Sequence, residues 1–295
     1  MAKGDPGACD RTYANSRLAE GSDLKAEPTA MSAREQRSYE KTLNRRLHKM
    51  GYNNKAAAAR GGGNNNIRID VFMHVLRKNN GDGNVSDKQI RRQIKVMNRA
   101  FAGRTDNDAA STRFRFRLKD TDRTKKTDWY KWRFKDDDRV AKKKLRRGTF
   151  EDLNVYIANL SGGLLGYAFY PNLPKKKLYR DGLVILNESL PGGRAKPYHR
   201  GDTATHELGH WLGLYHTFQN SCGRLGDRVE DTPRQEADVN VFECDESLNT
   251  CGRGTRRPDP VHNFMNYTDD KCINQFTRGQ DDRMKLSWLA YRKGR

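Results

Sequence analysis

The sequence predicts an α/β or α+β domain whose C-terminal part is irregular. Strand and helix patterns alternate from Ile67 to Trp211, whereas the region beyond is rich in glycine, aspartate and arginine. Four of the five cysteines fall within that second region. At 295 residues the chain is long enough for one large domain or two modest ones, each with a buried core.

The first 66 residues form a polar segment of mixed charge, distinct from the predicted globular domain. Within it, only Ser32 to Met50 has a pattern compatible with a helix. Residues 56 to 66 combine alanines, glycines and asparagines that have little to bury, so we expect a flexible, protease-accessible linker there. The globular domain is therefore predicted to span residues 67–295.

The first half of this domain is predicted to contain five strands and two helices. The strand Ile67–Leu76 begins with alternation and ends almost continuously apolar. Ser86 is a typical N-cap for a helix that places Ile90, Ile94 and Met97 on one face. Further strands are expected around Phe114 and Phe116 and at Leu153–Leu160, Leu164–Tyr170 and Gly182–Leu186, and a second helix is expected from about Asp202.

The stretch from Lys119 to Lys144 is highly charged and carries Trp129, Tyr130 and Trp132. Basic residues interleaved with aromatic ones can bind nucleic acid by stacking on its bases. The same pattern is typical of an exposed hairpin with an aromatic inner face, and this is the interpretation we favour.

The net charge of +20, from 57 Lys+Arg against 37 Asp+Glu, suggests contact with a polyanion. The charge is uneven: residues 104–147 hold 17 basic and 8 acidic side chains, a net of +9, whereas residues 222–272 hold 7 basic and 11 acidic, a net of −4. A uniform phosphate-binding surface is therefore not expected, nor is specific nucleic-acid binding. No stretch approaches the roughly 20 apolar residues that a membrane-spanning helix requires.

Four cysteines, Cys222, Cys244, Cys251 and Cys272, lie close together in the acidic region. This clustering favours two disulfides and an oxidising compartment, so the protein is predicted to be secreted, although no signal peptide is visible in this chain. A zinc site is the competing explanation, but the spacing lacks paired C-x2-C. Three disulfide connectivities remain open from the sequence, and Cys9 is left over.

The second helix contains residues 206–216, His-Glu-Leu-Gly-His-Trp-Leu-Gly-Leu-Tyr-His, which match the pattern H-E-x-x-H-x-x-G-x-x-H. Residues four apart lie on one helical face, so His206 and His210 can direct their imidazoles at one metal ion. Gly213 permits a sharp turn that lets His216 supply a third ligand. Three protein ligands leave a fourth position of a zinc ion open to water.

An open zinc site predicts the hydrolysis of peptide bonds. The ion lowers the pKa of its water towards about 7 and polarises a carbonyl oxygen. Glu207 lies next to the ligands and can act as the general base, taking the proton of this water and passing it to the departing amine. The expected function is that of a zinc metalloendopeptidase with one catalytic Zn²⁺, acting on protein or peptide substrates.

The motif and the later stretch Asn263–Tyr267 together resemble the metzincin metallopeptidases and their Met-turn. Residues 166–168, 181–184 and 211–218 and Cys272 narrow this resemblance to the pappalysin family, over about residues 67–289. The resemblance implies a twisted mixed β-sheet, an active-site helix and an irregular C-terminal subdomain stapled by disulfides. It also implies an upper subdomain of about residues 67–213 and a lower one of about residues 214–295.

The family's roles can be carried over to matching positions. His206, His210 and His216 match its zinc ligands and Glu207 its general base. Met265 would form an apolar floor beneath the metal. Tyr267 would approach the zinc or the oxyanion of the tetrahedral intermediate, or would only pack as an aromatic residue.

Two further features are implied by the same resemblance. The cysteines would pair first with third and second with fourth, Cys222 with Cys251 and Cys244 with Cys272. Residues 226–233 resemble a calcium-binding loop, in which the oxygens of Asp227, Asp231 and Thr232 would be suitable ligands for Ca²⁺. A solvated acidic turn without calcium is the alternative.

Pappalysin-like enzymes are made with an N-terminal prosegment, which residues 1–66 would represent. In some of them a prosegment cysteine occupies the open zinc position, and Cys9 is the candidate here because a thiolate is a strong zinc ligand. The chain would then be a latent zymogen until cleavage between Arg60 and Asn66.

The residues after the Met-turn, Asp269, Asp270 and Lys271, are expected to shape the pocket for the side chain that follows the cleaved bond. Either aspartate would favour arginine or lysine in a substrate, whereas Lys271 would oppose that preference. The alternative function, from a different class, is a metzincin-fold protein that binds heparin or another polyanion with little or no turnover. Retention of Glu207, which no structural zinc site needs, favours the enzyme.

Overall fold

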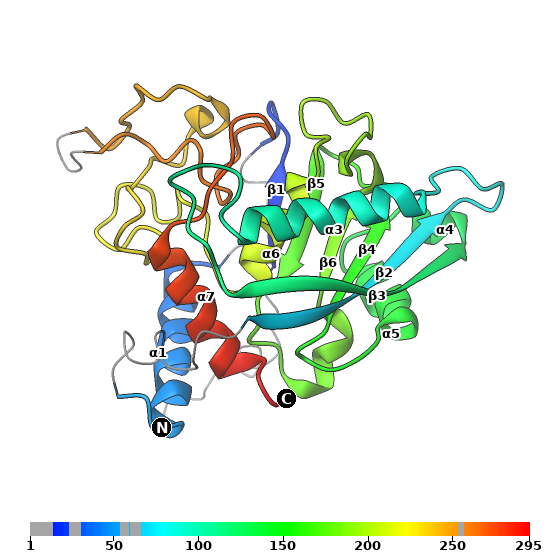
Figure 1. Ribbon diagram of the computed structural model, residues 1–295, viewed down its shortest axis with the longest axis horizontal. Coiled ribbons are helices and arrows are strands. Elements are labelled where there is room, and N and C mark those ends of the chain that lie inside the picture. Colours follow the sequence, from blue (N-terminus) through cyan, green and yellow to red (C-terminus); the bar gives the residue numbers. More distant parts are fainter. Residues whose placement is uncertain (1–13, 24–30, 54–58, 60–65, 253–256) are drawn as a thin grey trace, which may run out of the picture.

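Six strands form one mixed sheet in the computed structural model, which describes residues 14–23, 31–53, 59, 66–252 and 257–295 (Figure 1). The strand order is β1-β5-β6-β4-β2-β3. The strands are β1 (Ala14–Leu18), β2 (Ile67–Arg77), β3 (Phe114–Lys125), β4 (Leu153–Ala158), β5 (Leu164–Phe169) and β6 (Leu183–Leu186). Neighbours among β2, β3, β4 and β6 pair in parallel, whereas β5 is antiparallel to both β6 and β1. The predicted mixed sheet is confirmed.

The helices cover both faces of this sheet and one side of the molecule. They are α1 (Ala33–Lys49), α3 (Asp87–Phe101), α4 (Thr127–Tyr130), α5 (Asp136–Leu145), α6 (Asp202–Trp211) and α7 (Arg278–Tyr291), with short 3-10 turns η2 (Lys175–Arg180), η3 (Asn187–Ser189) and η4 (Val239–Phe242). Ser86 caps α3 as predicted, with its side chain accepting a hydrogen bond from the Gln89 backbone.

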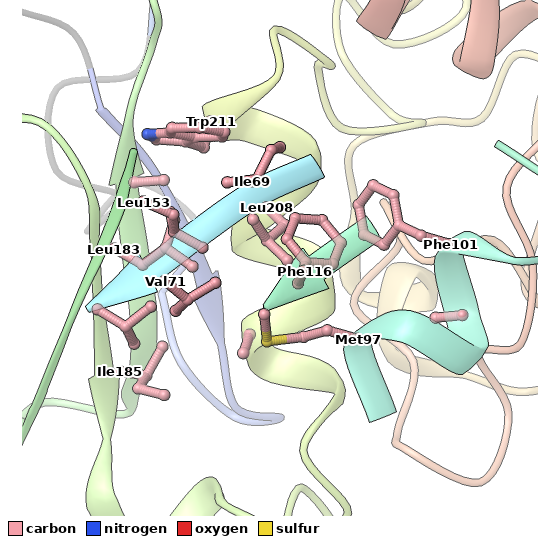
Figure 2. Packing of buried hydrophobic residues seen from close by; sticks show 14 of the residues in the cluster. Ile69, Val71, Met97, Phe101, Phe116, Leu153, Leu183, Ile185, Leu208 and Trp211 are labelled. Atoms are coloured by element: carbon pink, nitrogen blue, oxygen red, sulfur yellow. The ribbon is translucent and has the colours of Figure 1, made fainter. Parts of the chain in front are cut away.

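The larger core lies between the sheet and the helices α3 and α6. Figure 2 shows Val71 and Leu183 of the sheet, Met97 of α3 and Leu208 of α6 in this core. The strand β2 lies between β4 and β3, and both of its faces are covered, which explains why its sequence becomes continuously apolar. Val75 packs in this core, whereas Leu76 packs on the opposite face of the sheet. The inner face of the motif helix, with Ala204 and Leu208, is therefore packed against the sheet.

The hairpin predicted for Lys119 to Lys144 is wrong. The strand β3 runs on to Lys125 and the chain then forms the helices α4 and α5. Three aspartates in the first turn of α5 and three lysines in its last turn match the helix dipole, a signal that the hairpin interpretation overlooked.

The aromatic residues of this stretch do face inwards, as that interpretation required. Trp129 and Trp132 are 6% and 4% exposed, and the Trp132 indole donates to the Tyr167 hydroxyl at 2.7 Å. They pack in the second core, on the face of the sheet opposite α6. Their rings are therefore not available for stacking on nucleic-acid bases. Several basic side chains of β3 also pair with aspartates, for example Arg117 with Asp70 at 2.7 Å.

The predicted N-terminal helix is confirmed as α1, which lies beside α7 (Figure 1). Tyr39 and Leu43 of α1 pack against Tyr291 in a third apolar cluster. The strand β1 was not predicted, because Ala14–Leu18 has no strand periodicity. Of the expected linker, only Ala59 and Asn66 lie within the described residues, and Ala59 is buried in this third cluster.

The region between α6 and α7 is irregular, as predicted, and contains the short 3-10 turn η4. The disulfides Cys222–Cys251 and Cys244–Cys272 confirm the expected pairing. Every helix in the described part of the chain is too short or too polar to cross a bilayer.

Candidate active site

The motif helix α6 is buried along its whole length between the sheet and the C-terminal region. It ends because Leu212 caps it and Gly213 follows with a φ of +96°. A Cβ atom at Gly213 would lie 2.4 Å from the Ser287 hydroxyl, so only glycine fits the turn. This turn brings His216 back towards His206 and His210.

The three imidazoles converge on one point. The Nε2 atoms of His206, His210 and His216 lie 3.0–3.2 Å from one another. Tetrahedral coordination with Zn–N distances of about 2.0–2.1 Å places ligand nitrogens about 3.3 Å apart, close to this spacing. The donor set and its spacing therefore fit a zinc ion.

Second contacts of the histidines fix which nitrogen faces that point. His206 Nδ1 donates to the Phe264 carbonyl at 2.7 Å, and His210 Nδ1 donates to the Leu214 carbonyl at 2.9 Å. Each Nε2 therefore keeps its lone pair for a metal. Burial also lowers the pKa of His210 to about 3 and holds the pKa of His206 and His216 well below the usual value, which favours the neutral, ligating form.

Glu207 is fully buried on α6 beside the histidines. Its Oε1 accepts a hydrogen bond from the Arg17 backbone nitrogen at 2.8 Å. A Cβ atom at Gly166 of β5 would come within 3.1 Å of Glu207 Cγ and 2.9 Å of Thr203 Cγ2, so a glycine there lets β5 approach α6 closely.

Met265 lies directly against α6, as its expected place beneath the metal requires. A Cβ atom at Gly209 would lie only 2.2 Å from Met265 Sδ, which explains the glycine between the first two histidines. The turn that carries Met265 is stabilised by Asn263. The Asn263 side chain accepts a hydrogen bond from the Met265 backbone nitrogen at 2.9 Å and forms a further hydrogen bond with the Gln280 side chain.

Tyr267 stands beside the histidines with its hydroxyl in the site. Its ring centroid lies 4.8 Å from that of His216, and its hydroxyl donates to the Ser16 carbonyl at 2.7 Å. A phenol in this position can stabilise charge on a carbonyl oxygen held before the three imidazoles.

Of the three predicted pocket residues, the structure brings only Asp270 to the site. Asp270 is buried and accepts from the Arg17 guanidinium at 2.7 Å and from the Arg200 backbone nitrogen at 2.7 Å. Asp269 instead accepts from the backbone nitrogens of Lys271 and Cys272 and stabilises its own turn. Lys271 is exposed to solvent.

This geometry can be compared with known proteins. The family model described as pregnancy-associated plasma protein-A matches residues 135–288. An extracellular metalloprotease of Coccidioides posadasii is 40% identical over 234 residues, covering 78% of this chain and 79% of that protein, and one of Verticillium alfalfae is 40% identical over 233 residues, covering 77% of each. The chain belongs to the pappalysin family of metalloproteases.

Two solved structures are similar to this chain over most of its length. Mature mirolysin of Tannerella forsythia, with a cleaved peptide, superimposes with a TM-score of 0.63 at 29% identity, covering 77% of this chain and 96% of that one. Promirolysin of the same organism gives a TM-score of 0.70 at 28% identity, covering 93% and 94%. The predicted enzyme class, a metalloendopeptidase, is thereby confirmed, and the family implies a catalytic zinc ion.

Two buried residues near the candidate site were not singled out from the sequence. Asp202, at the start of α6, is buried, and this burial, followed by the charge of Asp270, raises the pKa of its carboxyl to about 7. Arg17, on the unpredicted strand β1, contacts Asp270. Asp202 lies one helical turn before His206, and this spacing could have placed it on the same face of the predicted helix. The sequence around Arg17 has no pattern that indicates a site.

The expected calcium loop is only partly assembled. Asp227 Oδ2 and Thr232 Oγ1 are buried and make no hydrogen bond of good geometry, and burial raises the pKa of Asp227 to about 8. Asp231 is engaged elsewhere, accepting from Thr277 Oγ1 at 2.7 Å and from the Gly279 nitrogen at 2.9 Å. Cys9, the expected thiolate ligand, lies outside the described residues.

Proposed function

We propose that the chain is a secreted zinc endopeptidase with Glu207 as general base and His206, His210 and His216 as the zinc ligands. The single observation that carries the proposal is the convergence of three Nε2 atoms within 3.0–3.2 Å, beside a buried carboxylate. Secretion is supported by the two disulfides and by relatives that are named extracellular metalloproteases.

Each site residue has a separate task in this mechanism. The zinc ion, when bound, supplies a Lewis acid that polarises the substrate carbonyl and makes water more acidic. Glu207 accepts the proton of the attacking water and returns it to the nitrogen of the leaving amine. Tyr267 donates to the carbonyl oxygen while negative charge develops there. Met265 and Gly209 keep α6 fixed during these steps.

Removal of zinc tests this function. We expect a chelator to abolish hydrolysis of a fluorogenic peptide by the full chain, and zinc to restore it. His216→Ala should lower the zinc content measured by mass spectrometry of the metal, because two protein ligands hold the ion more weakly than three. The exposed His48→Ala is the control and should keep a full zinc content. Hydrolysis that persists in metal-free protein would contradict the proposal.

The surroundings of Asp270 suggest which substrate side chain is preferred after the cleaved bond. We propose that Asp270 selects arginine or lysine after the cleaved bond, because its buried carboxylate already binds one guanidinium, that of Arg17. Asp202 lies in the same region, but its raised pKa of about 7 leaves its carboxyl only partly ionised at neutral pH, so Asp270 carries the selectivity in this proposal.

Asp270→Asn is expected to lower kcat/KM for peptides with arginine after the cut by about 10- to 100-fold, because a charge-assisted hydrogen bond contributes about 1.5–3 kcal/mol. Peptides with leucine at that position should change little. Asp269→Asn is the matched control, since that carboxylate bonds only to its own turn in the hydrogen bonds described above. Equal losses for both peptide types would contradict this role of Asp270.

The N-terminal 66 residues are proposed to be the prosegment of a latent zymogen, followed by a catalytic domain of residues 67–295 that divides near Gly213. Support comes from the extent of similarity, because promirolysin covers 93% of this chain and mature mirolysin covers 77%. In this proposal Cys9 remains a candidate ligand for the zinc, and cleavage between Arg60 and Asn66 releases the domain.

A calcium ion is proposed beside Asp227 and Thr232, whose buried oxygens it would satisfy. Calcium should then raise the melting temperature of the full chain, because a ligand at 100 times its Kd stabilises the folded state by about 2.7 kcal/mol. Asp227→Asn should remove this rise, whereas Glu230→Gln, at an exposed carboxylate of the same loop, should retain it. If calcium raised the melting temperature equally in the wild type, Asp227→Asn and Glu230→Gln, the ion would bind at another site.

A further inference from the structure

The helix α3 crosses one face of the sheet and presents its outer side to solvent (Figure 1). Five exposed side chains on this side are basic: Lys88, Arg91, Arg92, Lys95 and Arg99. Positions 88, 92, 95 and 99 follow the three- and four-residue spacing of one helical face, and Arg91 lies beside them. This row, here called the α3 stripe, is about 16 Å long at 1.5 Å per residue.

Within the described part of the chain, the α3 stripe has no acidic partner. None of its five members forms an ion pair with a described carboxylate. Asp87 is the one acidic residue of the helix, and it pairs with Arg123 of β3 instead. The positive charge of the stripe therefore remains available to an external anion.

The most basic stretch of the sequence, residues 104–147, differs in this respect. Several of its exposed cations are paired with aspartates of the fold, at N–O distances of 2.7, 3.1 and 3.6 Å: Arg117 with Asp70, Arg147 with Asp120 and Arg133 with Asp137. These pairs reduce the charge that a partner would meet. Ion pairing therefore moves the candidate anion-binding surface from this stretch to α3 and its C-terminal end.

The α3 stripe leads into a groove of about 640 Å³ at the C-terminal end of the helix. Four of the six residues that line the groove are basic and none is acidic: Lys95, Arg99, Arg104 and Arg115. Arg99 Nε donates to the Arg104 carbonyl at 2.9 Å, and Arg115 Nη1 donates to the Thr112 carbonyl at 2.8 Å. These bonds hold two guanidinium groups in place, so less conformational freedom is lost when an anion binds.

The positive charges of the groove repel one another. Burial, followed by the charge of Arg104, lowers the pKa of the Arg115 guanidinium. Asp281 acts in the opposite direction, but its carboxylate is paired with Lys285. An anion between Arg104 and Arg115 would relieve this repulsion, and a guanidinium can bind an oxyanion through two parallel hydrogen bonds.

This surface fits a linear chain that carries anionic groups at intervals, because its cations recur about once per helical turn. A single-stranded nucleic acid would also need aromatic rings for stacking, and the only aromatic residue of α3, Phe101, is buried. The two disulfides indicate an oxidising, extracellular setting. We propose that the α3 stripe and its groove bind a sulfated polysaccharide.

This binding goes beyond the proposed function, because it requires no catalysis. The helix turns Ile90 and Met97 towards the core, and the α3 stripe lies on the opposite side. None of the five basic residues of the stripe belongs to the catalytic site described above. Bound polysaccharide would hold the enzyme at an anionic surface, and the binding can be measured separately from hydrolysis.

Titration of the full chain with a heparin oligosaccharide at several salt concentrations tests the proposal. The wild type should bind at about 0.15 M salt, with an affinity that falls as salt rises, because counterions are released on binding. The triple variant Lys88→Gln, Arg92→Gln, Lys95→Gln should bind about tenfold more weakly, because three exposed ion pairs are lost. The slope of log K against log salt should become shallower by about 2–3.

The matched control removes three exposed cations that are already paired with aspartates: Arg117→Gln, Arg133→Gln and Arg147→Gln. Both triple variants lower the net charge by the same amount. The control should bind heparin as the wild type does, and all three proteins should hydrolyse a short peptide equally, which shows that they are folded. Equal losses of heparin binding in both variants would overturn the proposal, because binding would then follow net charge alone.

Two further ligands identify the partner. A polysaccharide that carries carboxylates but no sulfate should bind more weakly than heparin. If duplex DNA bound more tightly than heparin and lost affinity in the α3 variant, the stripe would be a nucleic-acid surface and the proposed partner would be wrong. If the wild type bound no heparin at about 0.15 M salt but cleaved the peptide, the inference would be overturned and the proposed function would stand.

Discussion

Glu207→Gln is expected to lower kcat/KM for peptide hydrolysis by about 10²- to 10⁴-fold, the usual contribution of a general base. Glutamine has nearly the shape of glutamate and can still accept from a backbone nitrogen, but it cannot carry a proton from water to the leaving amine. Glu207 is fully buried beside the histidines, so no other described carboxylate takes its place among the three imidazoles. The measurement is hydrolysis of a fluorogenic peptide by the full chain incubated with zinc.

The zinc content of Glu207→Gln should equal that of the wild type, because the ligand nitrogens are untouched. Glu236→Gln, at an exposed carboxylate, serves as the control and should retain full activity. If Glu207→Gln retained activity with normal zinc content, Glu207 would not be the general base.

Arg292→Met is expected to lower the free energy of unfolding by about 3 kcal/mol, near the lower end of the cost of breaking a buried ion pair, because Asp181 keeps a longer contact with Arg146 at 3.9 Å. Arg292 is fully buried and bonds to both Asp181 carboxylate oxygens, at 3.0 and 3.1 Å. It also donates to the Trp211 carbonyl at 2.9 Å, and its guanidinium lies 3.4 Å from the Trp211 ring centre. The variant therefore loosens the end of α6 that leads to Gly213.

Denaturant unfolding at a fixed zinc concentration measures this effect. Lys293→Met, at the exposed neighbouring position, should change the free energy of unfolding by less than about 0.5 kcal/mol. A double-mutant cycle with Asp181→Asn should show strong coupling, because the second substitution removes the buried charge whose two shortest ionic contacts are to Arg292. Additive effects would contradict the importance of this pair.

The features that could be predicted from the sequence have local signals. The strand β2 and the helix α3 follow from apolar periodicity and from the Ser86 cap. The histidine motif predicted its own geometry, because a helical repeat and a glycine turn suffice to bring His206, His210 and His216 together. The disulfide pairing came from family resemblance, since three connectivities are equally compatible with the spacing.

The features that were missed depend on contacts between distant segments. Ala14–Leu18 is too polar to be identified as a strand, and it becomes one only because β5 offers a free edge. The position of the Arg17 side chain depends on its hydrogen bond to Asp270, which lies 253 positions later in the sequence. The sequence likewise could not show which of Asp269 and Asp270 faces the site. In the folded loop the Asp269 carboxylate accepts hydrogen bonds from backbone nitrogens of its own turn, which leaves Asp270 to face the site.

We expect the edge of β5 to influence which polypeptides can be degraded. We expect a substrate to pair with this edge as β1 does, which requires it to be extended over about five residues. A helix or a tight turn has its backbone groups already bonded internally and cannot pair in this way. For a folded target, the rate of digestion would then be governed by how often a local stretch opens, so the enzyme would discriminate between proteins by their local stability as well as by the presence of a basic residue.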